Sequence, residues 1–109
     1  MAILMCRPEF FGIEYEINPW MHVAVEVDHE RAVEQWEAVH RTYTELGETI
    51  ALAPPVDGLP DMVFSANGGF VVDGIAIASR FRFPQRRGEE LAYERWFQAQ
   101  AFEKVLRPS

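Results

Sequence analysis

The stretch FVVDGIAIASRF, residues 70–81, constrains the fold of this chain more than any other. Two runs rich in β-branched and apolar residues flank Asp73 and Gly74, a pair that favours a type I′ turn because both residues tolerate a positive φ. The pattern predicts a β-hairpin with strands at Phe70–Val72 and Ile75–Phe81.

Helical patterns lie on both sides of the hairpin. Asp28 is a suitable N-cap, and apolar residues recur after it at intervals of three and four, which predicts a helix with one face on a core. Gly47 ends this helix as a left-handed cap. The second helix begins near Gly88. The apolar residues are Val33, Trp36, Val39, Tyr43 and Leu46 in the first helix and Leu91, Tyr93, Trp96 and Phe97 in the second.

Several short apolar runs predict further strands. They lie at Ala2–Cys6, in TIALAPP from Thr49, after Asp61, and in the closing FEKVLRPS, which resembles the first strand of another unit. Residues 10–21 read as an ordered loop, and residues 22–27 fit a short strand or an extended approach to the helix equally well. Helices that alternate with strands predict an α/β fold. The last strand leaves a sheet edge that another element must cover.

Composition excludes several functional classes. The chain has 109 residues, of which 49% are hydrophobic, enough for one domain or less with a real core. A net charge of −7 disfavours nucleic acid as a partner. No apolar run approaches the length of a membrane span or a secretory leader, and the single Cys6 cannot form an internal disulfide. We therefore expect a soluble, cytoplasmic protein without a membrane partner.

Asp61 has two interpretations. It follows Pro60 and precedes the apolar run Met62–Phe64, so it can cap a turn through an Asx hydrogen bond, as aspartate commonly does after proline. Alternatively, a carboxylate fixed at a strand end beside the ring of Phe64 can pair with a guanidinium. The residues alone leave both interpretations open.

Arg86 and Arg87 also have two interpretations. They can form a solvated basic turn that balances Glu89 and Glu90 at the start of the second helix. Alternatively, the planar fork of arginine can bind a carboxylate in a bidentate manner. If Asp61 takes a guanidinium and Arg86 a carboxylate, the ligand carries these groups at its two ends, as arginine does.

Other candidate groups are weaker. His22, Asp28 and His29 match no established metal-ligand spacing, so we expect neither a metal nor any other cofactor. Cys6 lies on a predicted buried strand, where a free cysteine behaves as a small apolar residue. Trp36 and Trp96 are most simply core residues.

Three blocks of sequence give a more specific hypothesis. MCRPEFFGIEYEINPWM, GLPDMVFSANGG and SRFRFPQRRGEE together resemble the N-terminal part of the guanidine-modifying enzymes. This family comprises dimethylarginine dimethylaminohydrolase, arginine deiminase, arginine dihydrolase and the amidinotransferases. The resemblance covers nearly the whole chain.

The resemblance implies a pentein-type propeller of five αβ modules around a substrate channel, with mixed sheets and helices on the outside. Residues 1–109 have room for roughly two of those modules and would form one incomplete domain. The family reaction is attack by a cysteine thiolate on the guanidinium carbon, with a histidine as general acid and base. Water or an amine then resolves the covalent intermediate.

The resemblance also implies roles for five residues. Asp61 would bind guanidinium nitrogens, Phe64 would wall the pocket, and Arg86 or the adjacent Arg87 would hold the substrate carboxylate. Dimethylarginine hydrolases usually have an acidic pair where this chain has Ala66 and Asn67, and the amide of Asn67 supplies no charge to a guanidinium nitrogen. The sequence SAN resembles arginine dihydrolases and amidinotransferase-like bacterial members, so the resemblance leaves the substrate and the outcome of the reaction open.

The catalytic residues of the family are expected outside this chain. Cys6 is on the first strand, and none of His22, His29 and His40 falls in a catalytic motif of the family. The chain is thus expected to be the N-terminal substrate-binding portion of an enzyme, to self-associate into a propeller, or to be an arginine-binding module. The expected partners are a small guanidino compound and either further copies or a complementing C-terminal chain.

Overall fold

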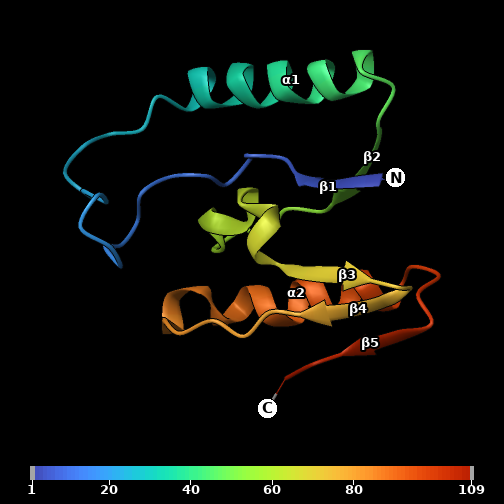
Figure 1. Ribbon diagram of the computed structural model, residues 1–109. Helices are drawn as coiled ribbons and strands as arrows, with labels where there is room; N and C mark the ends of the chain where they lie inside the picture. The colour runs from blue at the N-terminus through green and yellow to red at the C-terminus, as the bar shows by residue number, and fades with distance from the viewer. Residues whose placement is uncertain (1, 109) are drawn as a thin grey trace.

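The computed structural model describes residues 2–108, which form a small α/β arrangement of two sheets and two helices. The first sheet pairs β1 (Ala2–Cys6) with β2 (Thr49–Ala53) in parallel, and α1 (His29–Glu45) connects them. The predicted α/β class is therefore confirmed. Figure 1 shows α1 above the β1–β2 pair.

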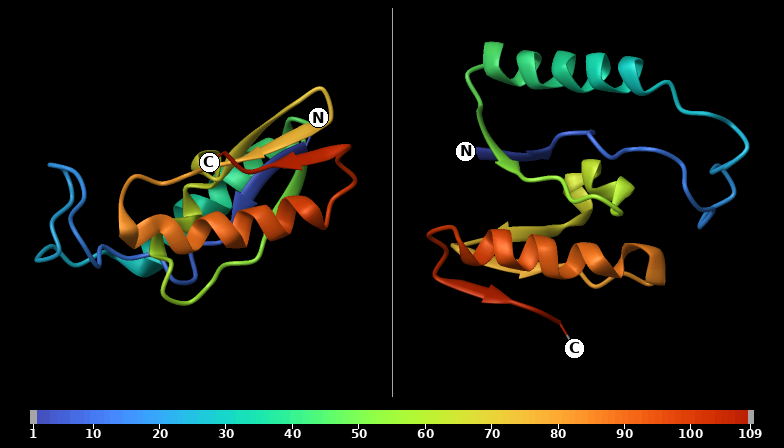
Figure 2. Two further views of the ribbon diagram at one scale, coloured as in Figure 1. Left: turned by 90° about the horizontal axis from the view of Figure 1, so that it is seen from below. Right: turned by 180° about the vertical axis from the view of Figure 1, so that it is seen from behind.

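The second sheet contains the predicted hairpin. Strands β3 (Gly69–Val72) and β4 (Ile75–Ala78) are antiparallel, and β5 (Lys104–Leu106) adds to β4 in parallel after α2 (Arg87–Gln98). Asp73 and Gly74 both have positive φ, 50° and 77°, as the type I′ prediction requires. Figure 2 shows α2 along one face of this sheet.

Two expectations about this sheet are wrong. The strand after the turn ends at Ala78 rather than Phe81, because the backbone N–H of Phe81 donates to the side chain of Glu90 instead of to a neighbouring strand. The closing strand does not begin another unit, since β5 completes the same sheet as β4. Within the described residues, β3 and β5 form the two edges of this sheet.

The strand predicted after Asp61 is also absent. Residues Pro60–Val63 and Ser65–Asn67 form two short 3₁₀ turns. Proline suits the first position of a helical turn because its φ is already fixed and it has no N–H to leave unpaired. The apolar run Met62–Phe64 therefore splits, with Met62 in the core and Phe64 half exposed.

The core joins both sheets through the 3₁₀ turns and α2. Its central members are Met62, Tyr93 and Phe97, and Tyr93 donates a hydrogen bond to the carbonyl of Met62. The predicted apolar face of α1 is only partly covered, because Trp36 is buried whereas Val39 and Leu46 are exposed. The remaining core residues are Cys6, Ala53, Ala76 and Ala78.

Between β1 and α1 the described chain forms a long loop without helix or strand, as predicted for residues 10–21. Residues 22–27 belong to this loop as well. Figure 1 shows it, in blue, extending beyond the rest of the fold. Over residues 2–108, no helix combines the length and the apolar character that crossing a membrane requires.

Candidate functional site

Asp61 is held at the centre of a polar cluster. Asp61 lies in the first 3₁₀ turn and is only 5% exposed, and its Oδ2 accepts a hydrogen bond of 2.5 Å from the hydroxyl of Tyr15. The described residues provide no side-chain cap for this turn. The Asx-capping interpretation of Asp61 is therefore wrong, because its carboxylate contacts another side chain instead.

Arg86 is fixed beside Asp61 by a carboxylate from its own helix. It precedes α2, and its Nε and Nη2 each lie 2.8 Å from one carboxylate oxygen of Glu89. Glu89 is in the first turn of α2, where a negative charge is favourable, and its side chain is fully buried. A bidentate pair of this kind is among the strong, charge-assisted hydrogen bonds of proteins.

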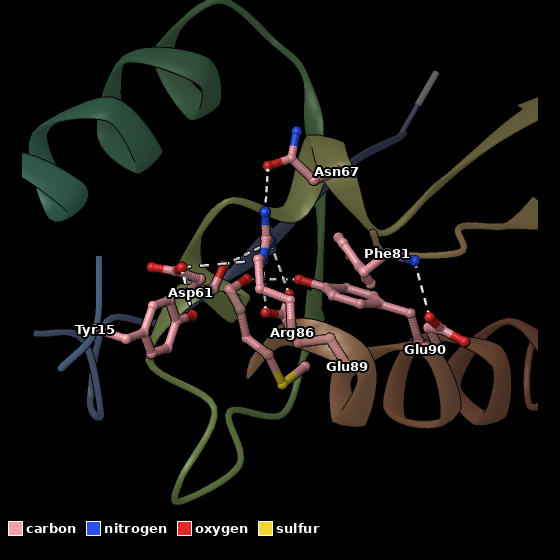
Figure 3. Close-up of polar contacts among 9 residues, drawn as sticks. Tyr15, Asp61, Asn67, Phe81, Arg86, Glu89 and Glu90 are labelled. Atoms are coloured by element: carbon pink, nitrogen blue, oxygen red, sulfur yellow. Dashed lines mark hydrogen bonds and ion pairs between the residues drawn. The ribbon is translucent and has the colours of Figure 1, made fainter. Parts of the chain in front are cut away.

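The other donors of Arg86 join Asn67 and Asp61 to the cluster. Nη1 donates to Oδ1 of Asn67 at 3.0 Å, and Nη2 donates to the backbone carbonyl of Asp61 at 3.2 Å. The guanidinium carbon also lies 4.5 Å from the ring centroid of Phe81. Four of the five N–H groups of Arg86 are thus paired, which leaves one, on Nη1, for a ligand. Figure 3 shows Arg86 between Asn67, Asp61 and Glu89.

Asp61 and Arg86 lie close to each other. Nε of Arg86 is 4.0 Å from Oδ2 of Asp61. That Asp61 binds a guanidinium and Arg86 a carboxylate stays a prediction. Arg86 also has too few unpaired N–H groups for the bidentate grip on a carboxylate that its fork would otherwise allow.

The charges in the cluster do not cancel. Asp61 and Glu89 carry two negative charges and Arg86 carries one positive charge, so the ionised cluster has one negative charge in excess. Burial alone would lower the pKa of Arg86, but Glu89 and Asp61 outweigh this and raise it. Burial and the hydrogen bond to Asp61 raise the pKa of Tyr15, which keeps its hydroxyl protonated as a donor. The cluster therefore favours a cationic ligand.

The predicted site residues that remain to be placed are Phe64 and Arg87. Phe64 is 48% exposed and packs edge-to-face on Phe11, with ring centroids 5.8 Å apart. Arg87 lies outside the cluster, because it donates to the backbone carbonyls of Phe81 and Arg82. Asn67 and Arg86 line an open hollow of about 620 Å³ that reaches along β3 and β4.

Two members of the cluster were not predicted from the sequence. Tyr15 lies 46 positions from Asp61, in the loop before α1, and only its place in an aromatic segment marked it. Glu89 appeared to be a surface partner of the arginines, yet it is fully buried. The spacing of three residues between Arg86 and Glu89 at a helix start was the available signal.

Outside this cluster, the described residues include one free cysteine, Cys6. Burial, with a smaller contribution from Glu89, raises the pKa of the Cys6 thiol to about 11, so this thiol is protonated at neutral pH. A protonated, fully buried thiol is a poor nucleophile. Within residues 2–108, no group of three or more His, Cys, Asp or Glu side chains is placed to hold a metal ion.

Comparison with known proteins identifies relatives along nearly the whole chain. No protein-family model matches it. It is 48% identical over 101 residues to N(G),N(G)-dimethylarginine dimethylaminohydrolase of Mycobacterium tuberculosis, an alignment that covers 93% of this chain and 33% of the relative. It is 43% identical over 103 residues to the bifunctional arginine dihydrolase/ornithine cyclodeaminase ArgZ of Synechocystis, covering 94% of this chain and 14% of that protein.

Solved structures agree with these relatives. The N-terminal domain of ArgZ bound to product has a TM-score of 0.90 and 40% identity, with 99% of this chain and 39% of that chain covered. The dimethylarginine dimethylaminohydrolase of Pseudomonas aeruginosa complexed with citrulline has a TM-score of 0.78 and 26% identity, with 99% and 41% covered. The present chain thus spans about a third of the length of the mycobacterial relative.

Proposed function

We propose that this chain, which belongs to the guanidine-modifying enzymes, is the N-terminal substrate-binding portion of an enzyme that acts on arginine or a methylated arginine. One observation carries the proposal. Asp61, Asn67 and Arg86, which the family resemblance assigned to substrate, meet in one cluster that has an excess negative charge. Free arginine carries one net positive charge, which complements this cluster.

The geometry favours a particular orientation of the ligand. The 4.0 Å between Arg86 and Asp61 suits the α-amino acid end, where an ammonium and a carboxylate are adjacent. Asp61 would accept from the ammonium, and the remaining N–H of Arg86 would donate to the carboxylate. Phe64 and Asn67 would then border the rest of the ligand, and Arg87 would serve only if the loop at residues 81–87 rearranged.

Titration with ligand analogues, followed by nuclear magnetic resonance, tests this proposal. We expect L-arginine to shift the Nε–H resonance of Arg86 and the side-chain amide of Asn67. L-norvaline keeps the α-ammonium and α-carboxylate but has no guanidinium, and should still shift Arg86. Agmatine lacks the carboxylate and should bind more weakly than arginine. Shifts with agmatine but none with norvaline would place the guanidinium at Asp61, and no shift with arginine would refute the proposal.

The chemical step would use groups outside the described residues. We propose that a cysteine thiolate attacks the guanidinium carbon, displacing ammonia or an amine and leaving an amidino thioester-like adduct that water or an amine resolves. A histidine would transfer the protons. The buried, protonated thiol of Cys6 supports the assignment of the nucleophile to another part of the enzyme.

The uncovered surface supports the propeller expected from the family. A hollow of about 420 Å³ lies between β1 and β3, lined by Ile3 and Met5 on one side and Phe70 and Val71 on the other. Phe70 is 60% exposed, and the β1–β2 sheet has only two strands within the described chain. Two-stranded sheets are marginal alone. Residues 1–109 would therefore be one incomplete domain to which further αβ modules add.

A second candidate function follows from the same surface. If further copies of the chain supply the missing modules, it is a self-assembling or arginine-binding module without its own chemistry. Light scattering coupled to size exclusion distinguishes the two candidates. A defined oligomer favours self-assembly, whereas a monomer that gains mass only with a complementing chain favours the portion of an enzyme.

A further inference from the structure

Tyr15 contacts Asp61 from a part of the chain that otherwise contributes little to the fold. It lies in the loop between β1 and α1, and its hydroxyl donates to Oδ2 of Asp61 at 2.5 Å. The same loop places Phe11 against the ring of Phe64. Both contacts are made to residues proposed to line the ligand site. These two contacts therefore hold the loop against the candidate site.

The two carboxylate oxygens of Asp61 have different surroundings. Oδ2 accepts from Tyr15 and faces Nε of Arg86 at 4.0 Å. Oδ1 accepts no hydrogen bond from the described residues, and it is not fully buried. A carboxylate oxygen in this situation can accept from a ligand. Figure 3 shows the carboxylate of Asp61 beside the ring of Tyr15, with Arg86 on its other side.

We propose that Tyr15 is a positioning residue for the ligand site, because its hydroxyl fixes the Asp61 carboxylate with Oδ1 turned toward the ligand's cationic group. This inference rests on the proposed function. Without the hydroxyl, the carboxylate of Asp61 can rotate about χ2 toward Arg86 and pair with it more closely. The oxygen that serves the ligand would then be taken up by a side chain of the protein.

The substitution Tyr15→Phe tests the proposal, because it removes the hydroxyl and keeps the ring. Tyr43→Phe is the matched control, since Tyr43 lies on α1 and its hydroxyl makes no hydrogen bond within the described residues. Two quantities are measured in each variant: the carbon resonance of the Asp61 carboxyl group, and the dissociation constant for L-arginine. The resonance reports the orientation and hydrogen bonding of Asp61, which a general loss of stability would not change selectively.

We expect Tyr15→Phe to shift the Asp61 resonance and to raise the dissociation constant about tenfold, the effect of losing one hydrogen bond to a charged group. Tyr43→Phe should change neither. An unchanged Asp61 resonance in Tyr15→Phe would overturn the proposal, and so would a shifted resonance with unchanged affinity. If the wild-type chain binds no arginine, the proposed function fails and the ligand role of Tyr15 fails with it, whereas the resonance still reports whether Tyr15 orients Asp61.

Discussion

Arg86 and Glu89 form a bidentate ion pair at the start of α2, with each carboxylate oxygen 2.8 Å from a guanidinium nitrogen. Glu89 is fully buried, and the side chain of Arg86 is 12% exposed. A surface pair of this spacing would contribute little, but a buried pair cannot lose one partner without leaving a charge uncompensated. The geometry of the candidate site thus depends on Glu89 as well as on the residues that we propose to face a ligand.

Glu89→Gln should therefore lower the free energy of unfolding by about 3 kcal/mol, because the buried guanidinium of Arg86 loses its main counter-charge. Glu37→Gln is the control, since Glu37 pairs with Arg7 on the surface and should change the value by less than about 1 kcal/mol. Urea denaturation measures both variants. Equal effects of the two substitutions would show that the Arg86–Glu89 pair is not buried as described.

Gly68→Ala should destabilise the fold by about 1–3 kcal/mol through overpacking. A Cβ at Gly68 would lie 2.7 Å from ring atoms of Tyr93, which is fully buried and bonded to Met62. Gly12→Ala meets nothing within 4 Å and should leave stability nearly unchanged. Thermal unfolding of the two variants separates these cases, and a neutral Gly68→Ala would contradict the close contact between the 3₁₀ turn and α2.

Asp28→Ala should cost about 1 kcal/mol, because the side chain of Asp28 accepts from the backbone N–H of Arg31 and caps α1. Asp57→Ala provides a comparison at an exposed aspartate whose side chain makes no hydrogen bond within the described residues. Helical circular dichroism during urea unfolding gives both values. A cost for Asp57→Ala as large as that for Asp28→Ala would argue against the capping role.

Glu90 should make stability depend on pH in the acid range. Burial alone would raise its pKa, but the N–H of Phe81 and the guanidinium groups of Arg107 and Arg80 outweigh this, so the pKa in the folded state is lowered. Because the unfolded chain binds the proton more readily, the stabilisation by Glu90 is present above the ordinary glutamate range and is lost as pH falls through the native pKa.

Comparison of wild type with Glu90→Gln at pH 7 and at about pH 3 tests this linkage, the lower value being below the ordinary glutamate range. The variant should be less stable at pH 7, and the difference should shrink in acid. Glu34→Gln on α1, where Glu34 makes no ion pair within the described residues, should show no such change. A difference for Glu90→Gln that stays constant between the two pH values would contradict the linkage.

Local signals in the sequence predicted the parts of the fold that local chemistry determines. Asp73 and Gly74 predicted the hairpin because the turn requires their positive φ. Asp28 predicted the start of α1 because its side chain caps the helix. The prediction of a strand after Asp61 is wrong, since the apolar character of this run reflects one buried residue, Met62, rather than a period of two.

The candidate site was only partly predictable for a similar reason. The family motifs named Asp61, Asn67 and Arg86, and the structure brings these three together. No sequence pattern connects Tyr15 to Asp61, because that hydrogen bond joins a loop to a distant turn. The sequence also could not show that Glu89 accepts from two of the five N–H groups of Arg86, which depends on the burial of both side chains.

Titration calorimetry of L-arginine into the wild-type chain and into Asp61→Asn tests the central claim, that Asp61 provides the charge that binds the ligand. The substitution keeps the shape of the side chain and removes its charge. We predict that wild type binds and that Asp61→Asn weakens binding by about 1.5–3 kcal/mol, roughly 10- to 150-fold. Equal affinity of the two proteins, at unchanged folding, would contradict the account.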